Sequence, residues 1–411
     1  MRSSPTALLW LRRDLRIHDH PALAAARRGA DALVPVFCFD DRLLHGRHAS
    51  GPRTQFMLEC LADLDESLRK RGSRLVVRHG RPEEQLPALA RECGAAAVHF
   101  TADVGPFARA RDAHVTRALE IPVHEHPGMF VIDDLDAIRT TAGKPYTVFT
   151  PFYRTWARAP RRKPHGTPRS LPPVPAGLDP GTLPKLTDLR LEQEVEAPRC
   201  RGGVRTGDSP LSPYLHFGCI SARELELRSP EVARQLCWRD FFAHVLLHHP
   251  QNARSEYQAR YRGTIRWSRA RKRFEAWCEG RTGFPFVDAG MRQLRREGYI
   301  DNRARLVAGS FLTKDLGIDW RWGERWFMRL LLDGDEANNN GNWQWIASVG
   351  VDPQPVSRRI LNPALQQKRY DPEGAYVRRY VPELQDGDYP KPIVDHARAR
   401  KEALARYRVA S

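Results

Sequence analysis

Short apolar blocks alternate with amphipathic stretches over the first third of the chain. Runs rich in Val, Leu and Ala predict β-strands at residues 7–11, 32–39, 74–78, 96–100 and 121–124. Apolar positions at helical spacing predict helices between them, at 51–71, 82–93 and 107–120. This alternation predicts a Rossmann-like α/β domain built on a doubly wound parallel sheet. Ligands of such sheets bind beyond the carboxyl ends of the strands, where Arg13 and Asp103 stand.

The rest of the chain is predicted to be helical, after an irregular connector. Residues 160–184 hold many prolines and few periodic apolar positions, which is typical of a linker. Later apolar periodicity predicts helices near 220–228, 231–248, 268–279, 284–297, 302–316 and 322–332, and a basic surface helix at 395–408. We therefore expect an α/β domain at 1–127, a connector at 128–200 and an all-α domain at 201–411.

Composition adds a preference for polyanions. The 411-residue chain carries a net charge of +17 and has a pI near 9.9. Residues 254–277 contain eight Lys or Arg against two Glu, interleaved with five aromatic residues. Basic residues among aromatic ones suit a phosphate backbone with bases nearby. A solvated arginine-rich helix face is the alternative.

Other sequence features exclude several classes of protein. No run approaches the roughly 18–20 apolar residues that a membrane helix needs, and the N-terminus has no signal-peptide shape. The seven cysteines are dispersed without a Cys-x-x-Cys pair, which argues against a zinc ribbon or a closely ligated iron–sulfur cluster. We expect reduced cysteines, no metal and a cytoplasmic location.

The segment Asp333–Trp345 is unusually polar and aromatic at once. It holds two aspartates, four asparagines and two tryptophans, directly after apolar helical patterns. Because buried polar groups must be hydrogen-bonded, such a segment predicts a site for a polar, flat ligand. The alternative is an Asx-rich turn that caps two helices.

A second candidate binding element begins at Tyr299. The following pattern predicts an amphipathic helix in which Asn302, Arg305 and Leu306 share one face. An amide, a guanidinium and an apolar side chain together suit a charged aromatic ligand. The alternative is that Arg305 forms an ion pair with an acidic loop, with Asp333 or Asp335 as partner. Both interpretations can hold, since a site residue is often oriented by an ion pair.

Five motifs carry a resemblance to a known family. They lie at residues 11–19, 237–242, 282–294, 301–305 and 333–345, in the family's order. Together they resemble the photolyase/cryptochrome flavoproteins, most closely the bacterial class I-type cyclobutane pyrimidine dimer photolyases, from about residue 5 to about 385. The resemblance implies a carbon–carbon lyase that repairs pyrimidine dimers in DNA by electron transfer from excited, reduced FAD. A cryptochrome photoreceptor, a six-four photoproduct enzyme and a DNA-binding module without flavin are the alternatives.

The resemblance also implies a set of FAD contacts. Asn339 matches the position beside flavin N5, and Arg305 would balance the charge of a reduced flavin. The implied cofactor-binding residues are Ser209, Leu211, Ser212, Arg239, Tyr299, Asn302, Arg305, Asp333, Gly334, Asp335 and Asn339. The diphosphate loop departs from the family, because Asp208 and Pro210 replace a threonine and an arginine, and residues 190–206 are too short for the usual preceding helix. Weaker flavin binding is therefore expected.

Electron transfer and lesion binding are assigned by the same resemblance. Trp343, Trp320 and Trp267 match the family's electron-transfer chain, although core packing alone would also explain buried tryptophans. The implied DNA and lesion contacts are Gln235, Trp238, Arg239, Asn302, Arg303, Leu306 and Trp345. Gln235 replaces the usual glutamate and Leu306 the usual methionine. No histidine lies in residues 301–306, so pyrimidine dimers are expected rather than six-four products.

A light-harvesting antenna is the last implied component. Residues 103–112 lack the Asn-Glu pair associated with folate antennas and look more like a deazaflavin-binding pattern, with Arg13 and Asp103 as contacts. A deazaflavin is therefore favoured over methenyltetrahydrofolate, with an empty pocket as the alternative. The expected partner is UV-damaged DNA, and the protein is expected to be a monomer.

Overall fold

The computed structural model describes residues 5–196, 211–352, 354–385 and 387–409. Contacts between residues divide the chain into two compact units. The first comprises residues 1–192 and 199–250, and the second comprises residues 193–198 and 251–411. In the part of the chain that is described, no helix has the length and apolar character needed to cross a membrane.

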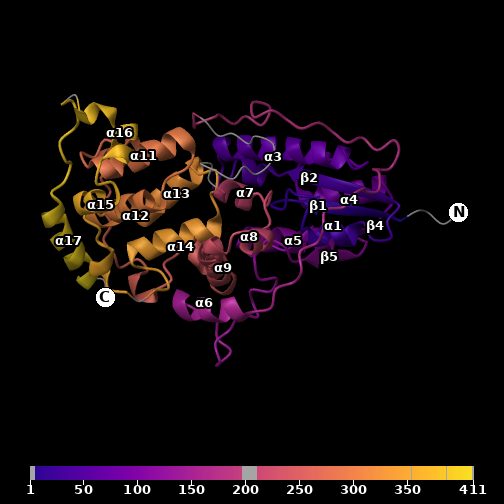
Figure 1. The fold of residues 1–411 in the computed structure, drawn as a ribbon, viewed down its shortest axis with the longest axis horizontal. Helices are drawn as coiled ribbons and strands as arrows, with labels where there is room; N and C mark the ends of the chain where they lie inside the picture. Colours follow the sequence, from indigo (N-terminus) through magenta and orange to yellow (C-terminus); the bar gives the residue numbers. More distant parts are fainter. Residues whose placement is uncertain (1–4, 197–210, 353, 386, 410–411) are drawn as a thin grey trace. The chain divides into compact units, whose positions relative to one another are not determined.

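A five-stranded parallel sheet forms the centre of the first unit (Figure 1). Its strands are β1 Thr6–Leu11, β2 Ala32–Phe39, β3 Val76–His79, β4 Ala95–Thr101 and β5 Val123–His126, in the order β3-β2-β1-β4-β5. Every residue of β1 is buried, which explains why the residues after Thr6 are all apolar rather than alternating with polar ones. The predicted α/β sheet is confirmed, and the observed strand ends differ from the predicted ones by two residues or fewer.

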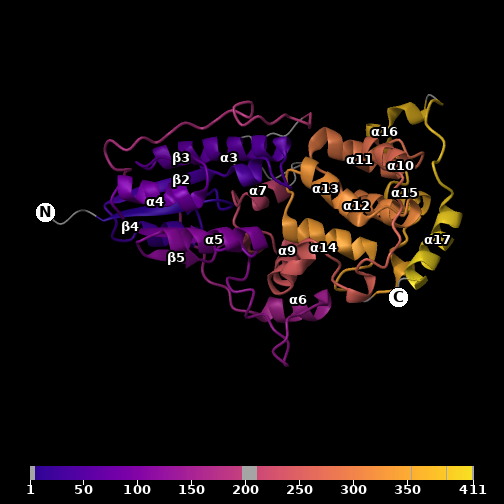
Figure 2. The same cartoon turned by 180° about the vertical axis from the view of Figure 1, so that it is seen from behind.

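Helices cover both faces of this sheet, as strand–helix alternation predicts. They are α1 Pro21–Ala26, α2 Asp41–Leu44, α3 Gly51–Arg69, α4 Pro82–Glu92 and α5 Pro106–Ala118. Trp10 and Val36 share one face of the sheet and belong to one core cluster with Leu86 of α4 and Val115 of α5. Helices α4 and α5 lie next to each other beside the sheet (Figure 2). Ser50 caps α3 by accepting a hydrogen bond from the backbone N–H of Arg53.

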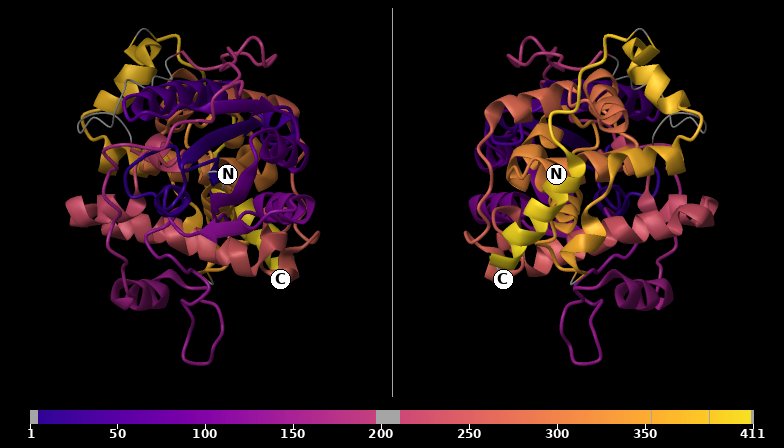
Figure 3. Two further views of the ribbon diagram at one scale, coloured as in Figure 1. Left: turned by 90° about the vertical axis from the view of Figure 1, so that its right-hand side faces the viewer. Right: turned by 90° about the vertical axis from the view of Figure 1, so that its left-hand side faces the viewer.

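The connector contains one helix that the sequence analysis did not assign. Phe149, Phe152 and Trp156 form a buried stripe on α6, Phe149–Arg158. The loop before α6 is closed by a bridge between residues 139 and 145 and extends beside that helix (Figure 3). Residues 159–196 form neither helix nor strand, as predicted for the linker. This linker is nevertheless held against the sheet, because the backbone N–H of Val77 donates to Pro180.

Residues 211–250 pack with the first unit, although the predicted ranges placed them in the all-α domain. They form α7 Ser212–His216, α8 Ala222–Arg228, the 3₁₀ turn η1 Pro230–Val232 and α9 Ala233–His248. The backbone N–H of Leu15 donates to Phe217, and a Cβ at Gly218 would lie 2.1 Å from the carbonyl oxygen of Arg13. Gly218 also has φ +68°, so glycine is required at this approach. The predicted boundaries at 127 and 200 thus differ from the division by contacts.

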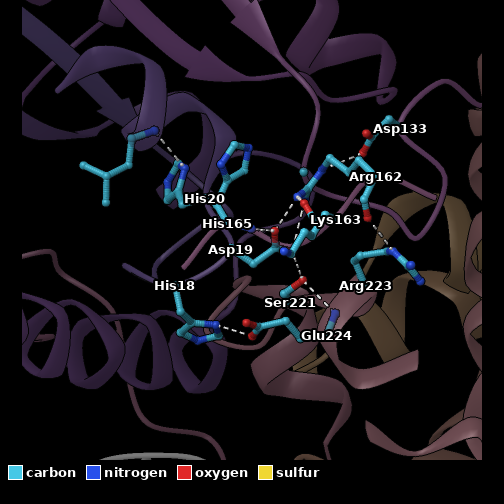
Figure 4. A network of polar contacts seen from close by, with 12 residues as sticks. His18, Asp19, His20, Asp133, Arg162, Lys163, His165, Ser221, Arg223 and Glu224 are labelled. Carbon is cyan, nitrogen blue, oxygen red and sulfur yellow. Dashed lines mark hydrogen bonds and ion pairs between the residues drawn. The ribbon is translucent and has the colours of Figure 1, made fainter. Parts of the chain in front are cut away.

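Asp19 joins three segments of the first unit (Figure 4). Its buried carboxylate accepts hydrogen bonds from Arg162 of the linker, from Ser221 at the start of α8 and from the backbone N–H of His165. Burial by itself would raise the pKa of Asp19, but hydrogen bonds from Arg162 and Ser221 lower it to about 2. The charged carboxylate therefore fixes the linker and α8 to the loop after β1.

The second unit is helical, as predicted (Figure 1). Its helices are α10 Arg271–Glu279, α11 Pro285–Glu297, α12 Asn302–Ser310, α13 Trp320–Leu330, α14 Glu336–Ala347, α15 Pro363–Tyr370, α16 Ala375–Tyr380 and α17 His396–Val409, with the 3₁₀ turns η2 Pro250–Ala253, η3 Ala259–Tyr261, η5 Val356–Arg359 and η6 Pro382–Gln385. The predicted α-helix over 302–316 is wrong in its last turn. Residues Phe311–Asp315 form the π-helical turn η4, in which the backbone N–H of Leu316 bonds to Phe311.

The polar segment 333–345 is mostly helix, which the sequence analysis did not predict. Asp335 caps α14 by accepting from the backbone N–H of Asn338. Along the helix, the Asn342 amide donates to the carbonyl of Asn338, and the Gln344 amide donates to Asn340. Asparagines disfavour helix interiors because their side chains compete for backbone groups, but here Asn342 and Asn340 bond within the helix and Asn339 donates to Glu324 of α13.

Candidate functional site

Arg305 and Asp333 form the ion pair that the sequence suggested. Arg305 Nη2 lies 3.6 Å from Asp333 Oδ2, and the two side chains are 24% and 11% exposed. Arg305 Nε and Asp333 Oδ1 are buried and have no hydrogen-bond partner among the residues that the structure describes. A buried polar atom left in this state costs about 1–3 kcal/mol. One spare donor and one spare acceptor within the same ion pair favour a polar ligand at this position.

Helix α14 places two more predicted residues in fixed orientations. Asn339 is buried, and its amide nitrogen donates to the carbonyl of Glu324 on α13 at 3.0 Å. Asp335 is engaged as the cap of α14 and also accepts from the Asn338 amide at 2.7 Å. These bonds leave the two side chains little rotational freedom, which a precise binding site requires.

Tyr299 and Asn302 flank the start of α12. Asp301 caps this helix, accepting from the backbone N–H of Arg303 at 2.8 Å, so the helix begins at Asn302. Asn302 is exposed, whereas burial raises the pKa of Tyr299 and keeps its phenol neutral. The two residues therefore offer hydrogen-bonding groups without charge next to the Arg305–Asp333 pair.

The three predicted electron-transfer tryptophans lie in the second unit at different depths. Trp343 and Trp320 are buried, and Trp267 is partly exposed. The Trp343 ring contacts Trp277 at 6.2 Å and Phe327 at 5.0 Å between ring centroids. In the described part of the chain, no direct ring contact joins any two of the three predicted tryptophans. Their role in electron transfer stays a prediction.

Trp238 of the first unit is stacked on an aromatic partner that the sequence analysis missed. The rings of Trp238 and Phe149 are parallel within 2° and their centroids lie 3.6 Å apart. Phe149 comes from α6 and Trp238 from α9, two helices that pack together. This stack supports one face of the half-buried indole of Trp238 and fixes its plane.

The other predicted lesion contacts differ in their exposure and in the contacts that they make within the protein. Gln235 is exposed and lies three residues before Trp238, on the same side of α9. The Arg303 guanidinium lies 4.1 Å above the ring of Tyr370. Leu306 is half-buried against the core of the second unit. The exposed amide of Gln235 and the partly exposed guanidinium of Arg303 can bind a nucleic acid, but their contact with DNA stays a prediction.

Arg239 has a structural task in the first unit. Its guanidinium donates to the backbone carbonyl of Met129 at 2.7 Å and lies 5.0 Å from the ring of Phe130. Leu211 directly precedes α7 and Ser212 is its first residue, and both are half-buried. Ser209, Asp208 and Pro210 of the predicted diphosphate loop lie outside the described residues.

The predicted antenna residues are brought together at the ends of β1 and β4. Arg13 Nη1 lies 3.6 Å from Asp103 Oδ2. Beside them, the Trp10 ring is covered by Arg12 at 4.5 Å and by Arg111 at 4.8 Å. A charged and aromatic cluster at the carboxyl ends of parallel strands is where ligands of such sheets bind.

Comparison with known proteins identifies the family of this chain. Residues 7–175 match the family described as DNA photolyase, and residues 232–388 match the FAD binding domain of DNA photolyase. The deoxyribodipyrimidine photo-lyase of Streptomyces griseus is 38% identical over 451 aligned residues, which cover 96% of this chain and 97% of that protein. The chain belongs to the photolyase/cryptochrome family.

Solved structures of photolyases share the fold. A bacterial class III photolyase from Agrobacterium tumefaciens has a TM-score of 0.89 and 31% identity, covering all of this chain and 98% of its own. An archaeal photolyase from Sulfolobus tokodaii, solved with two FAD molecules, has a TM-score of 0.86 and 32% identity, covering 98% and 99%. The resemblance to photolyases is therefore confirmed at the level of the family, and the class I assignment stays a prediction.

Membership of the photolyase/cryptochrome family makes FAD the ligand to test against the site. A flavin ring edge carries both N–H donors and carbonyl acceptors, which are the groups that Asp333 Oδ1 and Arg305 Nε lack. A guanidinium and a carboxylate that are already paired also leave the site near neutrality before the ligand binds. The residues present thus fit a flavin.

The structure adds residues that local sequence patterns could not supply. Phe149 supports Trp238, Trp277 contacts Trp343, and the indole N–H of Trp345 donates to Asp352 at 3.0 Å. The first two pairs join helices that are distant in the sequence, whereas Asp352 reaches Trp345 from the segment after α14. The nearest sequence signal was the apolar stripe of α6, which predicts burial but names no partner.

Proposed function

We propose that this protein is a deoxyribodipyrimidine photo-lyase that repairs cyclobutane pyrimidine dimers in DNA under blue light. The observation that carries the proposal is the Arg305–Asp333 pair with its two unpartnered buried atoms, in a chain that matches photo-lyases along nearly its whole length. Bound FAD, in its reduced form, would supply the photoexcited electron that opens the cyclobutane ring.

The residues of the second unit would hold the cofactor. Arg305 would offer positive charge to the flavin and favour its anionic, reduced form, while Asp333 would limit that charge and offer a hydrogen-bond acceptor. The fixed amide of Asn339 presents a neutral polar group where a carboxylate would repel an anion. Asp335, Gly334, Tyr299 and Asn302 are proposed as further contacts, together with Leu211, Ser212 and Arg239 of the first unit and Ser209.

The tryptophans would restore the reduced cofactor. Trp343, Trp320 and Trp267 are proposed to relay electrons from the surface, because the first two are shielded from water and the third reaches it. Indole has a large ring that shortens the gaps between relay sites, and its oxidised form is accessible. A purely packing role for these rings would leave photoreduction unaffected by their replacement.

The damaged strand would be bound by charge first and by stacking second. The net charge of +17 attracts the phosphate backbone, so affinity for any DNA should fall as the salt concentration rises. Trp238 and Trp345 are proposed to stack on the extruded dimer, and a poorly stacked dimer is cheap to extrude. Gln235, Arg239, Asn302, Arg303 and Leu306 are proposed as its other contacts.

Three further assignments belong to this proposal. A second chromophore is proposed at Arg13 and Asp103, at the ends of β1 and β4, with a deazaflavin as the first candidate. The described cysteines form no disulfide with one another, and this together with a DNA substrate favours a cytoplasmic location. The protein is proposed to act as a monomer.

The test is illumination of an oligonucleotide that carries one defined thymine dimer, using protein reduced with dithionite. The expected result is recovery of the ultraviolet absorbance of intact thymines in the light and none in the dark. Gln235→Glu, which restores a carboxylate acceptor, should retain or improve repair. Repair of a six-four lesion but not of the dimer would transfer the proposal to that substrate. A flavin-containing protein that repairs neither lesion would favour a cryptochrome photoreceptor.

A further inference from the structure

Trp345 of α14 is held by two polar residues that no sequence motif singled out. Its indole N–H donates to Asp352 Oδ2 at 3.0 Å. The guanidinium of Arg359, in η5, lies 4.5 Å from the centre of the indole ring. Arg359 Nη2 in turn lies 2.6 Å from the same Asp352 oxygen. The three side chains therefore form a closed set, which we call the Trp345 clamp.

The clamp removes the freedom that an exposed tryptophan would have. A tryptophan side chain rotates about two bonds, and a hydrogen bond at the ring edge together with a planar group over one face restrains both. The indole of Trp345 is half-buried, whereas Arg359 is only 2% exposed. Arg359 thus covers one face of the indole from the protein side, and the part of Trp345 that remains accessible lies elsewhere on the ring.

The Arg359 side chain makes few other polar interactions. Among the residues that the structure describes, its guanidinium has no hydrogen-bond partner of good geometry, and its only ion pair is with Asp352. Burying a guanidinium costs free energy that even an ion pair often does not recover, so the position of Arg359 against Trp345 points to a role for that contact. Its backbone carbonyl does accept from Ser310, but that bond is independent of the side chain.

A comparison with Trp343 shows that this arrangement is specific to Trp345. The two tryptophans lie two residues apart on α14 and face different surroundings. Trp343 is 3% exposed and contacts the aromatic rings of Trp277 and Phe327. Ordinary core packing explains Trp343, but a half-buried indole in contact with a buried guanidinium and a half-buried carboxylate needs another explanation. Pre-orientation of the ring for a stacking ligand supplies one.

We propose that Arg359 and Asp352 are positioning residues that hold the indole of Trp345 ready to stack on an extruded pyrimidine dimer. This inference rests on the proposed function, which places Trp345 at the lesion. The pair acts before DNA arrives, by preventing the ring from adopting orientations that cannot stack. Asp352 is neutralised by Arg359, so its carboxylate does not repel the phosphates of the approaching strand. Pre-orientation of the ring should raise the affinity for damaged DNA only, because intact DNA does not present an extruded base to the ring.

The test compares Arg359→Met with a matched control, Arg358→Met. Arg358 is the adjacent, exposed arginine, and its guanidinium donates to Gln354 rather than contacting Trp345. Each variant loses one positive charge, so both should bind undamaged duplex more weakly. Only Arg359→Met should reduce the ratio of affinities for a thymine-dimer duplex and the same duplex undamaged. We expect a loss of about tenfold, within the range that one base–aromatic stack supplies.

A second measurement reports the clamp without DNA or light. The indole N–H resonance of Trp345, assigned by its disappearance in Trp345→Phe, should shift in Arg359→Met and in Asp352→Asn but not in Arg358→Met. Arg359→Lys keeps the charge without the planar stack and should recover only part of the affinity ratio. Asp352→Asn and Arg359→Lys also keep the test valid if Arg359→Met does not fold.

The outcomes separate the inference from the proposed function. An Arg359→Met protein with the wild-type affinity ratio and an unmoved Trp345 resonance would overturn the positioning role, while leaving lesion binding intact. Equal loss of the ratio in Arg358→Met would also overturn it, because charge alone would then explain the effect. A wild-type protein with no preference for the dimer would overturn the proposed function and this inference together.

Discussion

A methyl group added at Gly323 should displace Trp343 and slow photoreduction of the flavin. Gly323 lies within α13, where the described backbone brings it against α14. A Cβ built at this position would lie 2.1 Å from Trp343 Cη2 and 2.6 Å from Leu312 Cδ2. Ordinary contact begins near 3.4 Å, so in Gly323→Ala the indole must retreat by about 1.3 Å, the difference between the two distances.

The size of the effect follows from two opposing contributions. Inserting a methyl group into a filled core costs about 1–3 kcal/mol. Replacing glycine by alanine within a helix recovers about 1 kcal/mol of backbone entropy. Because the ring must move by more than 1 Å, we take the upper half of the first range and expect Gly323→Ala to lose about 1–2 kcal/mol of unfolding free energy. Photoreduction should slow, since electron transfer depends steeply on distance.

Gly309→Ala is the matched control. Gly309 is also within a helix, α12, and also faces Trp343, but its Cβ would lie 3.6 Å from that ring and 3.1 Å from Ile346. Only a small adjustment of Ile346 is needed, so this variant should be neutral or up to about 1 kcal/mol more stable. Urea unfolding measures both free energies, and flavin photoreduction under blue light with an external reductant measures the rate.

A double-mutant cycle decides whether the Trp343 ring is the cause. Trp343→Phe removes the nearer of the two clashes, so adding Gly323→Ala to that variant should cost less, with Leu312 Cδ2 at 2.6 Å as the remaining atom that must move. The expected coupling is about 1–3 kcal/mol, as for residues in direct contact. The reasoning is refuted if Gly323→Ala is as stable and as rapidly photoreduced as the wild type, or if its cost is unchanged in the Trp343→Phe background.

Three other predictions concern electron supply, the cofactor and pH. Trp343→Phe should block photoreduction of oxidised flavin yet leave repair by dithionite-reduced protein intact; wild-type photoreduction in this variant would exclude the proposed relay. Arg305→Met should lose most of the bound flavin, measured by absorbance of the purified protein, and Arg305→Lys should retain more of it; full flavin content in Arg305→Met would show that the ion pair does not bind the cofactor. Burial raises the pKa of Asp240 to about 6 despite the hydrogen bond from Trp156. The folded state therefore holds a proton that the unfolded state loses near pH 4, so this contribution is complete below about pH 4 and is lost as pH rises to about 6, by about 3 kcal/mol. Asp240→Asn should lack that dependence in urea unfolding at several pH values, whereas an unchanged profile would assign it to another group.

The sequence by itself determined the elements whose physical cause is local. The parallel sheet was predictable because buried strands are apolar throughout and helices repeat between them. An ion pair of Arg305 with Asp333 or Asp335 was also predictable, because a guanidinium on an apolar helix face needs an anionic partner, and the fold selects Asp333. Family motifs supplied the flavin and the pyrimidine dimer, which no periodicity could specify.

Only the tertiary structure decided the elements whose stability comes from distant partners. Helix α14 has an asparagine-rich start that disfavours a helix in isolation, and it forms because Asp335 caps it and Asn339 bonds to α13. The π-helical turn η4 likewise appears where Lys314 is buried against Tyr407 of α17. Sequence periodicity records which side of an element is buried, but not what it meets there. The contact of Phe149 with Trp238 and that of Arg359 with Trp345 were therefore not predictable from the sequence, and only the folded structure shows them.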